Sequence, residues 1–158
     1  MNFEKYEFEF FQDKMEYEFF SVGPKGRIKK VVRFIKVSTN VGDIYNLGFG
    51  DWDERTRSMN DSMTSNNGDT DKVLITVAHI AIDFTERFLN AEILAIGTPG
   101  RIRLYRMKIT HQLVPIYTFF SISGLTKDNV IEPFVKDKDY IAFIAKRRLF
   151  KRNPHVNS

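Results

Sequence analysis

Alternating apolar and polar residues indicate that the first third of the chain is a β-meander. Aromatic and charged side chains alternate over residues 5–11 and 16–22, and related patterns follow at residues 27–37 and 44–49. This period of two is typical of strands with one buried face. The turn sequence Gly23-Pro24-Lys25-Gly26 joins two of these segments. We therefore expect antiparallel strands joined by tight turns.

A helical repeat of apolar residues replaces this alternation after Asp69. The apolar positions lie three or four residues apart, at Val73, Val77, Ile80, Ala81, Phe84 and Phe88. Other apolar residues between them leave only a narrow polar stripe, which predicts a central helix packed on most of its circumference. The acids Asp69 and Asp71 suit the start of this helix, where free amides and the positive dipole end favour capping residues and negative charge.

The rest of the chain alternates short apolar segments with helical ones. Thr98 and Pro99 suit the N-cap and the first turn of a second helix. We expect strands at residues 91–96, 115–124 and 131–135, the last at a sheet edge because of Pro133, and a closing helix at residues 140–150. These elements predict an α+β fold: an N-terminal antiparallel β-meander, then helix-strand-helix-strand, in a mixed sheet with helices packed on its faces in nearly three layers.

Length and composition predict one domain. The chain has 158 residues, of which 42% are hydrophobic, and it has no cysteine for disulfides or thiolate chemistry. We expect a single α+β domain at residues 1–152, with a mobile loop at residues 51–69 and a disordered tail at residues 153–158. The absence of an apolar leader or a membrane-length apolar run predicts a cytoplasmic protein without membrane contact.

Positive charge is concentrated in three short segments. The formal net charge is only +4, but basic residues cluster at residues 25–36, 101–108 and 146–152. Such clusters suit a phosphate-bearing small molecule or RNA. A protein partner, as in a defence or toxin–antitoxin pair, and a homodimer through an exposed strand edge remain open.

A turn before the second predicted helix is the best candidate for an anion site. The amides of a helix N-terminus bind anions, and Arg101, Arg103 and Arg106 add positive charge beside Thr98. The alternative is an ordinary strand-to-helix turn whose arginines are solvated or paired with acids.

Three further groups of residues each have two explanations. Trp52 is either a loop anchor or a stacking platform for a base. His79 and Asp83, four residues apart, either share a ligand or proton or form a local hydrogen bond. The acids of residues 67–72 could bind a cation, but helix capping explains them without one. Scattered histidines give no metal-binding spacing, and no metal site is predicted.

The order of predicted elements resembles the Gcn5-related N-acetyltransferase fold. The second helix contains Leu104-Tyr105-Arg106-Met107-Lys108-Ile109, which is similar to the LYxKxGF stretch common in that superfamily. The resemblance implies acyl-CoA as cofactor and Tyr105 as the general acid toward the departing CoA thiolate. It also implies that the loop containing Gly68 and Thr70 surrounds the CoA pyrophosphate. That loop has one glycine and two acids where the superfamily has several glycines.

Four stretches, SVGPKG, YNLGFGD, NNGDTDKVLITVA and GTPGRIRLYR, are similar to those of a family of small, uncharacterised bacterial proteins. This resemblance implies a bacterial origin and no known activity. The sequence thus favours an acyl-CoA-binding or N-acetyltransferase-like protein, with a nucleic-acid- or protein-binding module as the alternative. Whether the protein is an enzyme stays open.

Overall fold

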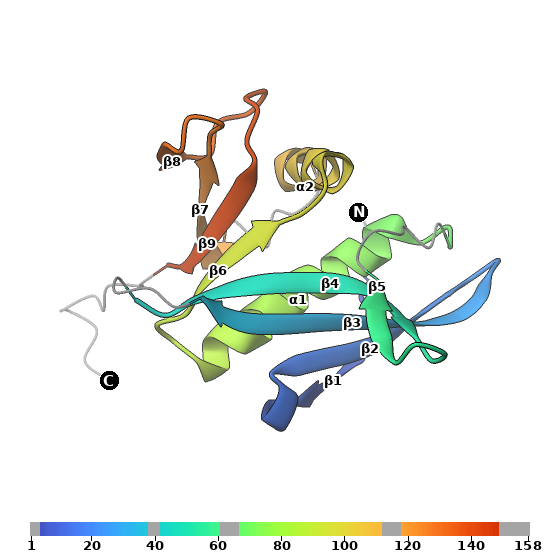
Figure 1. Ribbon diagram of the computed structural model, residues 1–158. Helices are drawn as coiled ribbons and strands as arrows, with labels where there is room; N and C mark the ends of the chain where they lie inside the picture. Colours follow the sequence, from blue (N-terminus) through green and yellow to red (C-terminus); the bar gives the residue numbers. More distant parts are fainter. Residues whose placement is uncertain (1–3, 38–41, 61–66, 112–117, 149–158) are drawn as a thin grey trace, which may run out of the picture.

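The computed structural model describes residues 4–37, 42–60, 67–111 and 118–148, and it contains a mixed β-sheet with two α-helices (Figure 1). In chain order the elements are β1 (Phe8–Phe11), the 3-10 turn η1 (Gln12–Lys14), β2 (Glu16–Gly23), β3 (Gly26–Val37), β4 (Ile44–Asp53), β5 (Ser58–Asn60), α1 (Thr70–Arg87), β6 (Glu92–Ile96), α2 (Pro99–His111), β7 (Phe120–Leu125), β8 (Ile131–Pro133) and β9 (Ala142–Arg147). The predicted meander, central helix, second helix and edge strand β8 are all present.

The described strands form one sheet in the order β1-β2-β3-β4-β6-β9-β7-β8, with β5 paired to β4 beside this path. β4 and β6 run parallel, and the other described pairs are antiparallel. The parallel pair follows from the connection, because the chain crosses over through α1 between β4 and β6.

Both helices pack on the same face of the sheet, so the expectation of helices on its two faces is wrong. The ring of Phe84 in α1 stacks on Phe34 of β3, with the centroids 3.8 Å apart. Ile102 of α2 joins Ile75 of α1 and Phe143 of β9 in a second buried cluster. In Figure 1, α1 (green) lies behind β3 and β4.

The other face carries charged side chains that are already paired. Glu16 and Glu18 of β2 form ion pairs with Arg33 and Lys29 of β3, respectively. These side chains alternate with the buried aromatics of the same strands, and therefore point away from α1. Such a face does not need a covering helix, which explains why two layers suffice for the described residues.

Strand β9 occupies the segment for which the sequence predicted a helix. Ala142 to Arg147 pair with β6 on one side and β7 on the other. A strand in the middle of a sheet is often apolar on both faces, and its run of apolar residues cannot be distinguished from a buried helix by periodicity. The prediction of a closing helix at residues 140–150 is therefore wrong for the described part.

Part of residues 51–69, for which the sequence predicted a mobile loop, forms a hairpin. β4 continues to Asp53, and β5 returns beside it with Asn60 opposite Asp51. Residues 61–66 lie outside the described residues, as does the tail at residues 153–158. No helix in the described ranges is long and apolar enough to cross a membrane.

Candidate ligand-binding site

The parallel strands β4 and β6 are paired along only part of their length. Their pairing runs from Ile44 and Glu92 to Leu47 and Ala95. Beyond this point β4 pairs with β5 instead, while the chain leaves β6 and enters α2. In α/β sheets, ligands bind beyond the carboxyl ends of parallel strands, and helix N-termini there favour anions. The region where α1 and α2 begin is therefore the candidate site.

Thr98 caps α2 as the sequence predicted. Its Oγ1 accepts a hydrogen bond from the backbone amide of Arg101 at 3.2 Å, and the next intrahelical bond runs from the Ile102 amide to the Thr98 carbonyl at 2.9 Å. Pro99 fits the first helical position because its missing N–H has no partner there in any helix. The predicted cap and its chemistry are thus confirmed.

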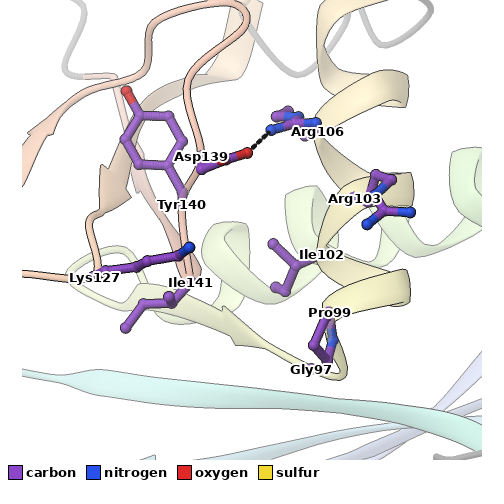
Figure 2. Close-up of a pocket in the computed structure, with 9 residues that line it drawn as sticks. All are labelled: Gly97, Pro99, Ile102, Arg103, Arg106, Lys127, Asp139, Tyr140 and Ile141. Carbon is purple, nitrogen blue, oxygen red and sulfur yellow. Dashed lines mark hydrogen bonds and ion pairs between the residues drawn. The ribbon is translucent and has the colours of Figure 1, made fainter.

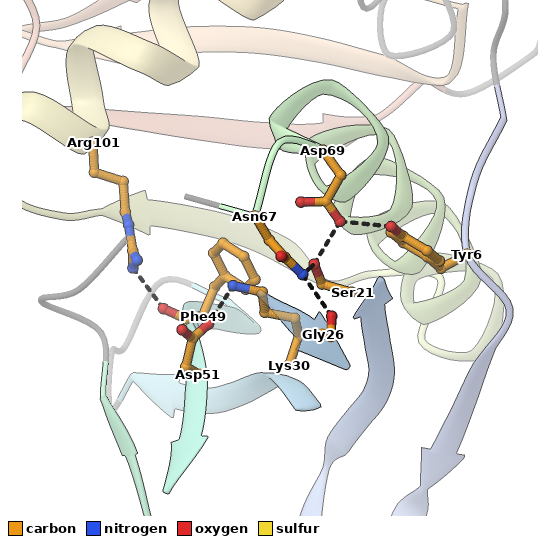
Figure 3. A network of polar contacts seen from close by, with 9 residues as sticks. All are labelled: Tyr6, Ser21, Gly26, Lys30, Phe49, Asp51, Asn67, Asp69 and Arg101. Carbon is orange, nitrogen blue, oxygen red and sulfur yellow. Dashed lines mark hydrogen bonds and ion pairs between the residues drawn. The ribbon is translucent and has the colours of Figure 1, made fainter. Parts of the chain in front are cut away.

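Arg101 reaches from α2 to the separated part of β4. Its Nη1 donates a hydrogen bond to the Phe49 carbonyl at 2.5 Å, and the guanidinium lies 5.1 Å from the centre of the Phe49 ring (Figure 3). Both contacts are to uncharged groups, and among the described residues Arg101 has no carboxylate partner. No acid of the described residues therefore neutralises the positive charge of Arg101. This charge lies beside the part of β4 that no longer pairs with β6.

Tyr105 lies one turn after Arg101 on α2 and packs against the second buried cluster. Burial raises the pKa of its phenol above the ordinary value of 10.0, and the charge of Arg101 opposes this shift. The phenol therefore keeps its proton at neutral pH. Tyr105 has no hydrogen-bonded partner among the described residues, so its hydroxyl is not committed to a structural bond.

Arg103 and Arg106 lie on another side of α2. Arg106 forms an ion pair with Asp139 at 2.6 Å and donates to the Lys138 carbonyl at 3.3 Å. Both arginines line a cleft of about 350 Å³ between α2 and the segment before β9 (Figure 2). The structure thus divides the predicted phosphate site, because Arg101 contacts β4 while Arg106 and Arg103 line this cleft.

A buried polar network anchors the start of α1 against the β2–β3 hairpin. The side chain of Asn67 is 1% exposed; it donates to Ser21 Oγ and the Gly26 carbonyl at 3.0 Å each, and accepts from the Lys25 amide at 2.7 Å. Gly23 allows this close approach, because a Cβ there would lie 1.9 Å from the Asn67 carbonyl oxygen. The network positions the loop that precedes α1 (Figure 3).

Asp69 has the N-cap position of α1, but its carboxylate does not cap the helix. Instead it accepts hydrogen bonds from Tyr6 Oη at 2.6 Å and Ser21 Oγ at 2.5 Å. The prediction that helix capping accounts for this acid is therefore wrong. Gly68 (φ +75°) and Thr70, both predicted to bind ligand, are exposed at this helix end.

An ion pair that the sequence analysis missed lies next to this region. Lys30 of β3, 3% exposed, forms an ion pair with Asp51 of β4 directly across the two strands. The alternation along the strand already indicated that Lys30 is buried, because Lys30 lies two and four positions before the buried Val32 and Phe34 and therefore points to the same face. A lysine on a buried face requires an acidic partner, and only the pairing of β3 with β4 identifies it.

Trp52 is part of β4, so it is not an anchor in an unstructured loop. Three positions separate it from Phe49, and it therefore points to the opposite face of the sheet. There the Lys29 ammonium lies 5.4 Å from the centre of its ring. The structure thus does not bring Trp52 together with Arg101 and Tyr105.

His79 and Asp83 do not form the pair that their spacing allowed. Asp83 accepts hydrogen bonds from Tyr17 Oη at 2.5 Å and from Arg87 Nε at 2.7 Å. Burial, assisted by the charge of Lys5, lowers the pKa of His79. Within the described part of the chain, no cluster of His, Asp and Glu side chains has an arrangement that could hold a metal ion.

Comparison with known proteins identifies a family but no activity. The chain matches neither a curated protein nor a solved structure. A family of unknown function, DUF6934, matches residues 2–148, which is nearly the whole chain. This agrees with the expected uncharacterised family and leaves the acetyltransferase resemblance without a matching relative. The chain belongs to the family of unknown function DUF6934.

Proposed function

We propose that the protein binds an acyl-CoA-type ligand between the beginnings of α1 and α2, and that it is acetyltransferase-like if it is an enzyme. The observation that carries this proposal is the separation of β4 from its parallel neighbour β6 under Arg101. The beginnings of two helices, and an arginine with no carboxylate partner in the described part of the chain, suit a phosphate-bearing ligand. The order of elements that suggested the superfamily also supports it.

The residues at the start of α1 are compatible with such a ligand. The first amides of a helix have no intrahelical acceptor, and the carboxylate of Asp69 does not cap them. Its hydrogen bonds to Tyr6 and Ser21 hold this acid to the β1–β2 side. Gly68 and Thr70 would then lie beside the pyrophosphate, and Arg101 would supply the positive charge.

Tyr105 has the properties of a proton donor in this proposal. Acyl-CoA, when bound, supplies an activated thioester. The raised pKa of Tyr105 keeps its hydroxyl protonated at neutral pH, and a positioned acid can protonate a departing thiolate.

The alternative of an RNA-binding surface on β3 has less support. Four of the five cations of this strand are paired with acids: Lys29 with Glu18, Lys30 with Asp51, Arg33 with Glu16 and Lys36 with Asp43. The fifth, Arg27, lies over the ring of Phe20. Paired cations release few counterions from a phosphate backbone, and non-specific RNA binding depends on that release. We therefore prefer the small ligand to RNA as the phosphate-bearing partner.

Isothermal titration of the full chain with acetyl-CoA, CoA and ATP tests this proposal, with Arg101→Ala and Arg103→Ala as matched variants. We expect the CoA compounds to bind, and Arg101→Ala to raise their Kd about tenfold, since a charge-assisted contact contributes about 1.5 kcal/mol or more. Arg103→Ala, on another side of the same helix, should change the Kd less than about twofold.

Two results would contradict the proposal. One is the absence of binding at about 1 mM acetyl-CoA, a concentration at which even weak specific ligands are detected. The other is an equal loss in both arginine variants, which would indicate non-specific attraction to the basic helix. In a screen of amine acceptors, Tyr105→Phe should preserve acetyl-CoA binding while lowering any acetyl transfer about 100-fold or more.

A further inference from the structure

The cleft on the Arg106 side of α2 has an apolar base and a positively charged rim. Figure 2 shows Ile102 of α2 and Lys127 pointing into the space between the helix and the segment before β9. The buried Ile102 and the partly exposed Ile141 supply apolar surface. The cleft volume of about 350 Å³ is at the lower end of the range for small-molecule sites.

The charges around the cleft do not balance. Arg103, Arg106 and Lys127 contribute three positive charges, and Asp139 contributes one negative charge. The ion pair with Asp139 neutralises the charge of Arg106. Within the described ranges Lys127 and Arg103 have no hydrogen-bonded or ionic partner. Like charges facing one space repel one another, and an anion between them removes that repulsion.

The backbone at Lys127 is fixed by hydrogen bonds within its turn. The Thr126 amide donates to the Val130 carbonyl at 2.9 Å, and the Asn129 amide donates to the Thr126 carbonyl at 3.0 Å. The Val130 amide also donates to Thr126 Oγ1 at 3.1 Å. On the other wall, the Ile141 amide donates to the Leu125 carbonyl at 2.8 Å. The backbone positions of both walls are therefore defined before any ligand arrives, which lowers the entropic cost of binding.

A neighbouring hollow does not share the excess of positive charge that the cleft has. It has a volume of about 390 Å³ and shares Lys127 and Asp139 with the cleft. Its other charged residues are Asp128, Glu132 and Lys138, so acids outnumber bases there. Lys138 is moreover paired with Glu132 at 2.5 Å. An anion is therefore expected in the α2 cleft and not in its neighbour.

We propose that the α2 cleft binds a small organic anion, a carboxylate or phosphate group on a short apolar stem. The anionic group lies between the Lys127 ammonium and the ion pair of Arg106 with Asp139, and Lys127 supplies the positive charge that no acid of the described residues neutralises. The stem covers the apolar base of the cleft and removes mainly the exposed surface of Ile141 from water. Arg101 faces β4, so occupation of this cleft does not depend on the proposed acyl-CoA site.

Titration of the full chain with hexanoate, inorganic phosphate and 1-hexanol, followed by amide NMR shifts, tests the site. We expect hexanoate to shift the amides of Ile102, Lys127 and Ile141. Lys127→Ala should raise the Kd about tenfold, as removal of a charge-assisted contact does. The matched control is Lys136→Ala, an exposed lysine between β8 and β9 that does not line the cleft, which should change the Kd less than about twofold.

The relative affinities identify the chemistry of the natural ligand. Tighter hexanoate indicates a carboxylate on an apolar stem, and tighter phosphate indicates a phosphate ester; either result supports the site. Binding of 1-hexanol as tight as that of hexanoate, an unchanged Kd in Lys127→Ala, or no binding of either anion at about 10 mM would overturn it. Arg101→Ala should leave hexanoate binding unchanged, and Lys127→Ala should leave acetyl-CoA binding unchanged, so failure of one site is distinguishable from failure of the other.

Discussion

Helix α1 begins among buried and half-buried polar side chains that are hydrogen-bonded to one another. Helix α2, in contrast, begins among arginines that point in different directions, one toward β4 and others toward an open cleft. Asn67 and Asp69 are bound by Ser21, Tyr6 and the β2–β3 turn. Around α2, Arg103 and Lys127 have no such partners in the described structure. Polar groups that are fully bonded inside a protein specify one structure, while charges left in a cleft are available to a ligand.

This difference predicts that substitutions at the start of α1 reduce stability and those around α2 mainly change binding. The largest effect is expected for Gly23→Ala, because its Cβ would lie 1.9 Å from the backbone oxygen of Asn67. We expect a loss of about 3 kcal/mol or more in the free energy of unfolding, as for other overpacked sites. Urea denaturation monitored by circular dichroism measures this loss.

Gly100→Ala is the matched substitution in α2. A Cβ at Gly100 has no atom within 4 Å, and alanine is the better helix former. We expect stability to stay the same or to rise by up to about 0.5 kcal/mol. Equal effects of the two substitutions would remove the contrast between the two helix starts.

A smaller effect is expected for Tyr6→Phe, which removes the hydroxyl that donates to Asp69. The same hydroxyl accepts a hydrogen bond from the Val22 amide at 3.0 Å. The expected cost is therefore about 2 kcal/mol at neutral pH, about 1 kcal/mol for each of the two bonds. Burial and then the bond to Asp69 raise the pKa of Tyr6 above 10.0. As the pH rises through 10.0 the unfolded chain loses this proton first, so the free energy of unfolding falls.

Urea denaturation at several values between about pH 8 and pH 11 measures both effects. Tyr6→Phe should lose less stability over this alkaline range than the wild-type protein. At neutral pH, Tyr105→Phe should cost less than about 0.5 kcal/mol, because no hydrogen bond to its hydroxyl is present in the described structure. A larger cost at Tyr105 than at Tyr6 would show that the phenol of α2 has the structural role instead.

The smallest effect on stability is expected for Asp139→Asn in the cleft. Its side chain is 75% exposed, and exposed ion pairs contribute little, so the free energy of unfolding should change by less than about 0.5 kcal/mol. Hexanoate should bind about two- to threefold more tightly, since the cleft loses its negative charge. A loss above about 2 kcal/mol would show that the pair with Arg106 holds α2 to the segment before β9.

Local sequence alone was sufficient for the elements whose cause is local. The apolar repeat of α1, the N-cap at Thr98 and the turn at Gly23 to Gly26 depend on residues a few positions apart, and each is present in the structure. The same reasoning identified Arg101, Arg103 and Arg106 as basic residues of one helix. The same reasoning could not predict that Arg101 lies in a different place from the other two arginines. Their surroundings differ only because the folded chain brings β4 to one side of α2 and the cleft to another.

Only the tertiary structure decided the features that join distant residues. β9 is a strand because β6 and β7 satisfy its backbone groups on both sides, although its apolar run equally suits a buried helix. The Asp69 carboxylate accepts hydrogen bonds from Tyr6 and Ser21, which lie 63 and 48 positions away, and not from the amides of its own helix. Lys30 can be buried because the sheet brings Asp51 opposite it. Such choices depend on which partners the folded chain brings within hydrogen-bonding distance, and the local pattern of residues does not contain that information.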